Sequence, residues 1–597
     1  MNIKRISVFA VTVFVLAAAF GAVFVSTANA AALKSGQKAF SVFHDMTQER
    51  DLKTFFPKYS DVSMRTLTIR DVPFEDEKNI FRVAPLFHLT RIDWSYIWFT
   101  QRELNAVKKL QDMGYTYCGT AAQHIPCWLG DRAPVDWLEN IVMTDIEGNY
   151  SIMPFIRTWK NPQLIGDISN PEYYRGHLEF YKKLIDAGCD QLQRDAAEHH
   201  YLAVTTCGGG FTKTGIAGFT KWLKQNLTVE ELNNIGIREI DNFNYKEYLI
   251  AKGAPVGDDF SRKYKCPIKE YWYKYWDDLT MEFFTRLVKD CKDYADRDIP
   301  MSLNNTSFQR WGPLQNIFDA GMSELMMVSA NPGHLWERFR ACEKLGKFQT
   351  IGSAKLLGLE VTHDEKKSLD LKVIATIYAN GGLAQVPWDT FEQTKDGSGR
   401  FFGEPEDYAP TFGFIRAAAD YLDGYERSYD YSTTGILTKT VEADDKPLEV
   451  KGTENEVCVF VRSKPGSARS PLAVHLVDWG KAMITPDGKD ANEVWELASG
   501  EKIYEYVKGM ENLKRSKPEP FELNIKRNAL NVEPEKLKFK LMTPRVYDRQ
   551  MHNEAEKSKD YSRLVKTVEL PFKADADKVT IQIPRLEFWG ILVIEQD

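Results

Sequence analysis

Hydrophobic and polar positions follow two alternating periods along residues 84–425. Short apolar runs such as 86–94 and 115–122 are typical of buried strands. Between them, 100–114 repeats its apolar residues at helical spacing, Thr100 with Glu103 forms a capping box, and a glycine follows the last apolar position. This segment is therefore predicted to be strand, helix, strand.

The same alternation continues, and the predicted strands are 86–94, 115–122, 162–169, 189–195, 299–305, 324–330, 348–354 and 383–391. The predicted helices between or after them include 100–114, 169–188, 332–345, 364–380 and 407–423. Eight strands interleaved with helices predict an α/β fold of the (β/α)8, or TIM, barrel type. An open parallel sheet is the alternative, but no G-x-G-x-x-G follows the first strand and the strand count favours closure.

The pattern changes after about residue 425. Short β-rich runs such as NEVCVFVRSK, PLAVHLVDWG and FWGILVIEQ are separated by turn sequences such as KPGS. This spacing predicts a C-terminal β-sandwich over 426–597. The predicted organisation is a barrel at 84–425, preceded by a segment at 31–83 that leads into it, with the sandwich following.

The first 30 residues have the pattern of a secretory signal peptide. Lys4 and Arg5 precede an almost wholly apolar run, and Ala28-Asn29-Ala30 is a small-x-small cleavage site. We expect cleavage after Ala30 and a secreted or periplasmic mature protein with no membrane association. The length of the apolar run leaves an uncleaved anchor as the alternative.

Composition narrows the possible partners. The net charge is −7 with both signs interspersed, so no basic stripe points to nucleic acid. The eight cysteines are scattered without a C-x-x-C pair, which predicts mostly free thiols rather than a disulfide framework or a zinc site, and a single bridge such as Cys118 to Cys127 is the alternative. No cofactor motif is found, and the sequence leaves the oligomeric state open.

Barrel folds place their functional residues at the carboxyl ends of the strands. The polar residues predicted at these ends, as candidates for binding a substrate, are His88, Arg91, Gln123, His124, Arg194, His199, Asn304, Asn305 and Trp388. Amides, histidines and a tryptophan together are typical of a sugar site. His199 and its neighbour lack a companion motif such as H-x-x-E-H, so no metal site is predicted.

Three carboxylates at predicted strand ends are candidate catalytic groups. Asp195 ends the fourth strand, and its alternative role is a structural partner of Arg194. Glu198 follows on the same loop, where it could instead begin a solvated helix. Asp389 follows the eighth strand, where a helix or loop cap is a common use of aspartate.

The segment QLQRDAAE, with the later FTKWL helix, resembles the fourth-strand region of family 42-like glycoside hydrolases of the clan A type. The resemblance implies a barrel glycosidase with two catalytic carboxylates. Two departures matter: the family's Asn-Glu pair lacks its Asn here, and its strand-seven glutamate has no counterpart before Glu360. Asp389, Glu360 and Glu324 stay open as the second carboxylate.

The sequence thus predicts a secreted glycoside hydrolase that acts on a poly- or oligosaccharide. Asp195 or Glu198 would donate the proton and Asp389 would act as nucleophile or base. Long connections after the second and fourth strands favour attack at chain ends, and a galactoside is the expected sugar. The absent strand-seven glutamate motivates an alternative, a catalytically inactive carbohydrate-binding protein on a barrel scaffold. Hydrolysis of a different bond is a third hypothesis, since barrels host many chemistries.

Overall fold

The computed structural model describes most of the chain from residue 56 onward. The described residues are 56–65, 79–122, 124–125, 141–153, 157, 164–195, 197, 199–304, 314, 316–326, 332–355, 363–387, 404–427, 447–465, 467, 470–481 and 517–596. Within these ranges, none of the helices combines the length and the apolarity needed to cross a membrane. The predicted signal peptide lies outside them.

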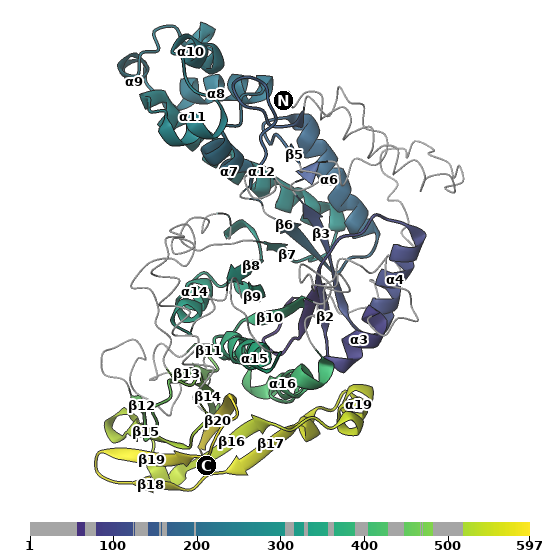
Figure 1. The fold of residues 1–597 in the computed structure, drawn as a ribbon, viewed down its shortest axis with the longest axis vertical. Coiled ribbons are helices and arrows are strands. Elements are labelled where there is room, and N and C mark those ends of the chain that lie inside the picture. The colour runs from purple at the N-terminus through teal and green to yellow at the C-terminus, as the bar shows by residue number, and fades with distance from the viewer. Residues whose placement is uncertain are drawn as a thin grey trace. The chain divides into compact units, whose positions relative to one another are not determined.

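Eight strands form a closed barrel in the order β1-β10-β9-β8-β7-β6-β3-β2 (Figure 1). Their bounds are β1 Ser63–Arg65, β2 Arg91–Ser95, β3 Thr116–Ala122, β6 Gln191–Asp195, β7 Met301–Leu303, β8 Ala320–Met326, β9 Phe348–Lys355 and β10 Leu383–Pro387. The pairs given by register, such as β1 with β10 and β6 with β7, are parallel. The predicted (β/α)8 barrel is therefore confirmed.

Two strand assignments need correction. The predicted strand at 162–169 contributes only β5 (Leu164–Ile165), which pairs antiparallel with β4 (His124–Ile125) outside the barrel. The barrel instead uses β1, which pairs with both β2 and β10. At three residues, β1 is too short to show a period of two, although all three of its residues are buried. The two errors cancel, so Asp195 still ends the fourth barrel strand.

The helices around the barrel are α3 (Ile80–Leu86), α4 (Gln101–Asp112), α6 (Pro171–Asp186), α14 (Pro332–Lys344), α15 (His363–Ala379) and α16 (Pro405–Ala417). The five predicted helices around the barrel are present, although α16 ends six residues before the predicted position, and the helix α3 was not predicted. The capping box of α4 is present, because Thr100 Oγ1 accepts from the Glu103 backbone N–H and the Glu103 carboxylate accepts from the Thr100 N–H.

A helical insertion joins β6 to β7. It comprises α7 (His199–Cys207), α8 (Lys213–Asn226), α9 (Val229–Asn234), α10 (Tyr245–Ala251), α11 (Gly257–Lys263) and α12 (Pro267–Ala295). Trp272 and Trp276 of α12 are fully buried. They belong to the core of this insertion, so they offer no surface for stacking a sugar.

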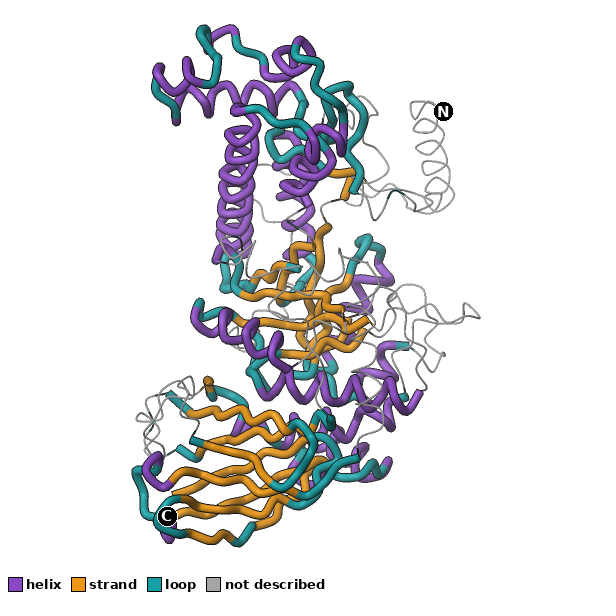
Figure 2. Tube along the Cα trace, turned by 60° about the vertical axis from the view of Figure 1, so that its left-hand side comes forward, coloured by secondary structure: helices purple, strands orange, loops and turns teal. Residues whose placement is uncertain are grey.

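The C-terminal region contains two antiparallel sheets, in the orders β11-β13-β14-β20-β16-β17 and β12-β15-β19-β18. The strands are β11 Glu426–Arg427, β12 Leu448–Lys451, β13 Val457–Ser463, β14 Leu472–Asp478, β15 Phe521–Lys526, β16 Leu537–Pro544, β17 Val565–Glu569, β18 Phe572–Ala574, β19 Lys578–Ile583 and β20 Trp589–Gln596. Figure 2 shows them side by side, in orange, around the C-terminus. One apolar cluster joins Leu476 of the first sheet to Leu523 and Ile581 of the second, so the predicted β-sandwich is confirmed.

Shorter elements complete the described chain: the helix α19 (Arg549–Ser558) and the 3-10 turns η5 (Ile240–Asn242), η7 (Ala419–Tyr421), η9 (Arg527–Ala529), η10 (Pro534–Lys536) and η11 (Ser562–Leu564). By compactness the described residues fall into two units. One holds 96–104 and 119–304, and the other holds 56–95, 105–118 and the residues from 314 onward. The predicted domain boundaries stay a prediction.

Candidate functional site

Strand β6 separates its side chains into two sets because successive residues of a strand point to opposite faces. Gln193 accepts a hydrogen bond from Thr120 of β3, at 2.9 Å. Arg194 instead contacts His177 of α6 and His200 of α7. Asp195 stands two residues after Gln193, so its side chain lies on the same face of β6 as that of Gln193. It is the last residue of the strand, at the carboxyl end.

The Asp195 carboxylate accepts hydrogen bonds at both oxygens. The Tyr96 hydroxyl donates to Oδ2 and the Asn304 side-chain amide donates to Oδ1, each at 2.5 Å. Tyr96 follows β2 and Asn304 follows β7, and the Asn304 N–H also extends the parallel ladder to the Arg194 carbonyl, at 2.8 Å. We call Tyr96, Asp195 and Asn304 the Asp195 cluster.

Two neutral donors on one carboxylate have a chemical consequence. Hydrogen bonds to the charged form stabilise that form. Asp195 is only 9% exposed, so the ionised group would otherwise lose much of its solvation. Burial opposes the charged form and the two donors favour it, so these contacts are compatible with a carboxylate that reacts as an anion, as nucleophile or base.

Arg194, predicted to bind substrate, has a different position. Its guanidinium is fully buried, and it lies 2.8 Å from His177 Nε2 and 2.7 Å from His200 Nε2. His200 Nδ1 in turn lies 2.9 Å from the Gly166 carbonyl. This corrects the prediction: the side chain joins β6 to its helices and faces away from the side that carries Asp195.

His199 begins α7, four positions after Asp195, and is 7% exposed. Burial, with the nearby positive charge of Arg194, lowers the pKa of His199 to about 3. Its imidazole is therefore neutral at ordinary pH and can serve as a hydrogen-bond donor or acceptor rather than as a cation. A substrate-binding role for His199 stays a prediction.

His88 lies at the wrong end of a strand for the predicted role. It precedes β2, with a left-handed backbone at φ 55°. Its Nε2 lies 2.7 Å from His552 Nδ1 and its Nδ1 lies 3.0 Å from Glu556 Oε2, both on α19, and its ring meets that of Tyr561 edge to face. This corrects the prediction of sugar binding, because both ring nitrogens already have partners. We call His88, His552, Glu556 and Tyr561 the His88 cluster.

Arg91 is the first residue of β2 and is 1% exposed. Its guanidinium contacts Asp93 at 2.8 Å and Asp61 at 3.3 Å. Burial opposes the charge, but the two carboxylates raise the pKa of Arg91 further. This corrects the predicted substrate contact, because the guanidinium is committed to a buried ion-pair network at the start of the strand.

Several predicted site residues have no described position. Glu198, Asp389, Gln123, Asn305 and Trp388 lie outside the described residues, as does Glu360. His124 and Glu324 lie in β4 and β8, without a described side chain. Sequence reasoning missed Tyr96, which stands one residue beyond β2. The sequence would have indicated Tyr96 as a polar residue at the carboxyl end of the strand if the predicted strand had ended at Ser95, where β2 ends.

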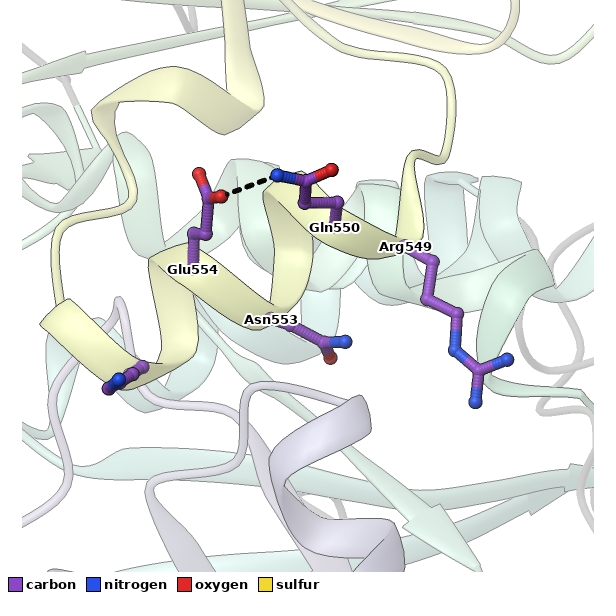
Figure 3. Close-up of a pocket in the computed structure, with 5 residues that line it drawn as sticks. Arg549, Gln550, Asn553 and Glu554 are labelled. Carbon is purple, nitrogen blue, oxygen red and sulfur yellow. Dashed lines mark hydrogen bonds between the residues drawn. The ribbon is translucent and has the colours of Figure 1, made fainter.

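A surface pocket lies along α19, lined by Arg549, Gln550, Asn553, Glu554 and Lys557 (Figure 3). All five side chains are exposed, and Gln550 Nε2 donates to Glu554 Oε1 at 2.9 Å. A single solvated helix face with no buried polar group has none of the features of a reaction centre. Across the described parts of the chain, no three His, Cys, Asp or Glu residues are grouped to hold a metal ion.

No family model matches the chain. The chain is similar to two curated α-agarases. It is 22% identical over 367 residues to the Thalassotalea agarivorans protein, covering 58% of this chain and 22% of that one. It is 22% identical over 259 residues to the Alteromonas agarilytica protein, covering 41% of this chain and 18% of that one. The chain thus spans about a fifth of the length of these relatives.

The similarity of this chain to solved structures is weaker. A Paenibacillus sp. cycloisomaltooligosaccharide glucanotransferase has a TM-score of 0.48 at 10% identity, covering 90% of this chain and 85% of that one. An α-amylase from H. orenii has a TM-score of 0.44 at 9% identity, covering 91% and 100%. The sequence similarity to α-agarases supports the broad resemblance to glycoside hydrolases and gives no support to family 42 in particular.

Proposed function

We propose that this chain is a glycoside hydrolase that cleaves a polysaccharide, with Asp195 as its nucleophile or base. The observation that carries the proposal is the Asp195 cluster: a carboxylate at the end of the fourth barrel strand, with a donor on each oxygen. The carboxyl ends of the strands are where barrel enzymes place their chemistry. The similarity to α-agarases supports a glycosidic bond as the target.

Glycoside hydrolysis usually needs a second carboxyl group, which donates a proton to the leaving oxygen. The sequence offers Glu198, Asp389, Glu360 and Glu324 for this part. Because the donors around Asp195 favour its ionised form, the proton donor is to be sought among these four. This reverses the role first predicted for Asp195, and it leaves both retention and inversion of the anomeric centre open.

The proposal extends to the kind of polysaccharide, the position of attack along its chain and the secretion of the protein. We propose a galactoside polysaccharide of the agarose type, since the curated relatives are α-agarases. The long connection after β6 favours attack at chain ends. The predicted leader supports secretion, with the barrel, now including β1, as the catalytic domain and the sandwich following it in the chain.

The test is turnover of a substrate panel by the mature protein. We expect reducing ends from agarose or its oligosaccharides, absent for Asp195→Asn. Proton NMR of the first product would then assign Asp195 as nucleophile if the anomer is retained, or as base if it is inverted. Binding of these glycans without release of any product would contradict the hydrolase. It would favour the carbohydrate-binding protein, which the absence of a carboxylate from β9 also motivates.

A further inference from the structure

Trp98 lies in the loop after β2 with 46% of its surface exposed. Of the tryptophans whose side chains the structure describes, it is the only exposed one, and the others are buried or half-buried. A single exposed apolar residue is common on protein surfaces and needs no special explanation. The backbone of the loop that carries Trp98, however, is held by hydrogen bonds to a buried side chain of α4.

Three hydrogen bonds fix this loop to one buried carboxylate. Glu103, which is 1% exposed, accepts from the Trp98 N–H at 2.9 Å, from the Thr100 N–H at 3.0 Å and from the Thr100 hydroxyl at 2.9 Å. The backbone of residues 98–100 is therefore tied to the first turn of α4. This anchoring restrains the backbone from which the Trp98 side chain projects.

Phe99 adds a conformational constraint. Its backbone is left-handed, at φ 58°, which is unfavourable for a bulky residue. Its ring contacts Phe180 of α6 edge to face, with centroids 5.3 Å apart. The strained backbone thus sends Phe99 toward a helix while its neighbour Trp98 stays exposed. Strain of this kind is concentrated at functional sites in proteins.

The same short loop reaches the reactive carboxylate. Tyr96, whose hydroxyl donates to Asp195, stands two residues before Trp98. Two residues of extended chain span at most about 7 Å. The backbone of Trp98 is therefore close to that of the residue that donates to Asp195. The flat apolar face of a pyranose ring is complementary to an aromatic ring, which offers a large apolar surface with a polar edge.

We propose that Trp98 is a stacking platform for a sugar unit next to the one that reacts at Asp195. The position of this subsite rests on the proposed function. Its role is to bind the extension of a chain, so it distinguishes an oligosaccharide from a single sugar. Tyr96 holds the carboxylate and Trp98 holds the neighbouring sugar, from one anchored loop.

The experiment measures binding apart from turnover. An agarose hexasaccharide and free galactose would be titrated by calorimetry into the full chain carrying Asp195→Asn, alone and combined with Trp98→Ala, Trp98→Phe or Ile250→Ala. Ile250 is an exposed apolar residue of α10 and serves as the matched control. Thermal unfolding of each variant would verify that the fold is retained.

We expect Trp98→Ala to weaken hexasaccharide binding by about tenfold, with galactose binding unchanged. Trp98→Phe should restore most of the affinity, and Ile250→Ala should have no effect. An unchanged Kd in Trp98→Ala, an equal loss in Ile250→Ala, or no hexasaccharide binding at all would overturn the platform.

Failure of the platform and failure of the hydrolase are distinguishable. If the wild-type chain binds the hexasaccharide through Trp98 but releases no product, the hydrolase fails and the platform stands. If turnover depends on Asp195 but neither binding nor turnover depends on Trp98, the hydrolase stands and the platform fails.

Discussion

The Asp195 cluster and the His88 cluster are both built from buried and half-buried polar side chains beside barrel strands, but their polar atoms have different kinds of partner. At the end of β6, the hydroxyl of Tyr96 and the amide of Asn304 each donate to one oxygen of the Asp195 carboxylate, and Asp195 is 9% exposed. At the start of β2, both nitrogens of a fully buried histidine are taken by side chains of α19. The first cluster holds the carboxylate that we propose as the reactive group, whereas the second joins two segments of the chain.

The proton arrangement of the His88 cluster supports this distinction. Burial would raise the pKa of Glu556, but hydrogen bonds from His88 and Lys559 lower it, so the group is an anion. In a neutral His88, Nδ1–H donates to Glu556 while Nε2 accepts from His552 Nδ1–H. Tyr561 donates its hydroxyl to the same carboxylate, at 2.9 Å. Polar residues near a strand therefore indicate function only when the end of the strand and the partners of each polar atom are known.

The largest effect is expected at Asp195. Asp195→Asn removes the negative charge but keeps the shape, so turnover should fall on the order of 10³-fold with little change in thermal unfolding. Initial rates on agarose oligosaccharides would measure it. Asp112→Asn, at the solvated end of α4, should behave as wild type. A rate within tenfold of wild type would remove the contrast between the two clusters.

His88→Ala should have the opposite effect to Asp195→Asn: it should lower stability and leave turnover unchanged. It leaves Glu556 and His552 without their buried partner, so the free energy of unfolding should fall by about 2 kcal/mol while kcat is unchanged. Urea denaturation and initial rates would be measured together. Gln550→Ala, on the exposed face of α19, is the control and should alter neither quantity. If His88→Ala lowered kcat without lowering the free energy of unfolding, the result would support a role for His88 in substrate binding.

Tyr96→Phe tests how the Asp195 cluster holds its charge. The variant keeps the ring but removes the donor to Oδ2, so kcat should fall about tenfold. Because one hydrogen bond to the ionised form is lost, the acidic limb of the pH–rate profile should move to higher pH. A profile of unchanged shape would mean that the hydroxyl only fills space.

The smallest effect is a change in acid sensitivity at the His88 cluster. Burial, with His88 beside it, lowers the pKa of His552 to about 4, from an ordinary value of 6.5. The unfolded chain then binds more protons between these values, so this contribution to stability is complete above about pH 6.5 and is lost as the pH falls toward 4. Asp548 opposes the shift, and Glu556 adds a loss at lower pH.

His552→Gln should therefore flatten the dependence of the unfolding free energy on pH in this window. Denaturation at several pH values would show it as a shallower slope, whatever the absolute stability of the variant. Asn553→Ala, one residue further along α19, should keep the wild-type slope. Equal slopes in His552→Gln and wild type would assign the acid sensitivity to other buried histidines, such as His475, whose pKa burial also lowers, to about 3.

The sequence by itself determined the features that depend on local pattern. The two periods predicted five helices around the barrel, the β-rich C-terminal region and the capping box of Thr100 and Glu103. They also placed Asp195 at the end of the fourth barrel strand, because an amphipathic helix and a glycine precede β6 directly. These signals lie within a few residues of each other, where hydrophobic period and capping act.

Only the tertiary structure decided which polar residues meet. Tyr96 and Asn304 reach Asp195 from 99 and 109 residues away, and His552 reaches His88 from 464 residues away. β1 became a barrel strand through its pairing on both sides, not through a pattern of its own. Arg194 and Asp195 are neighbours in sequence, but strand geometry turns Arg194 toward His177 and His200 on the helices and Asp195 toward Tyr96 and Asn304. Such contacts arise when strands that are distant in sequence pair and the barrel closes. The local spacing of hydrophobic residues carries no information about this pairing.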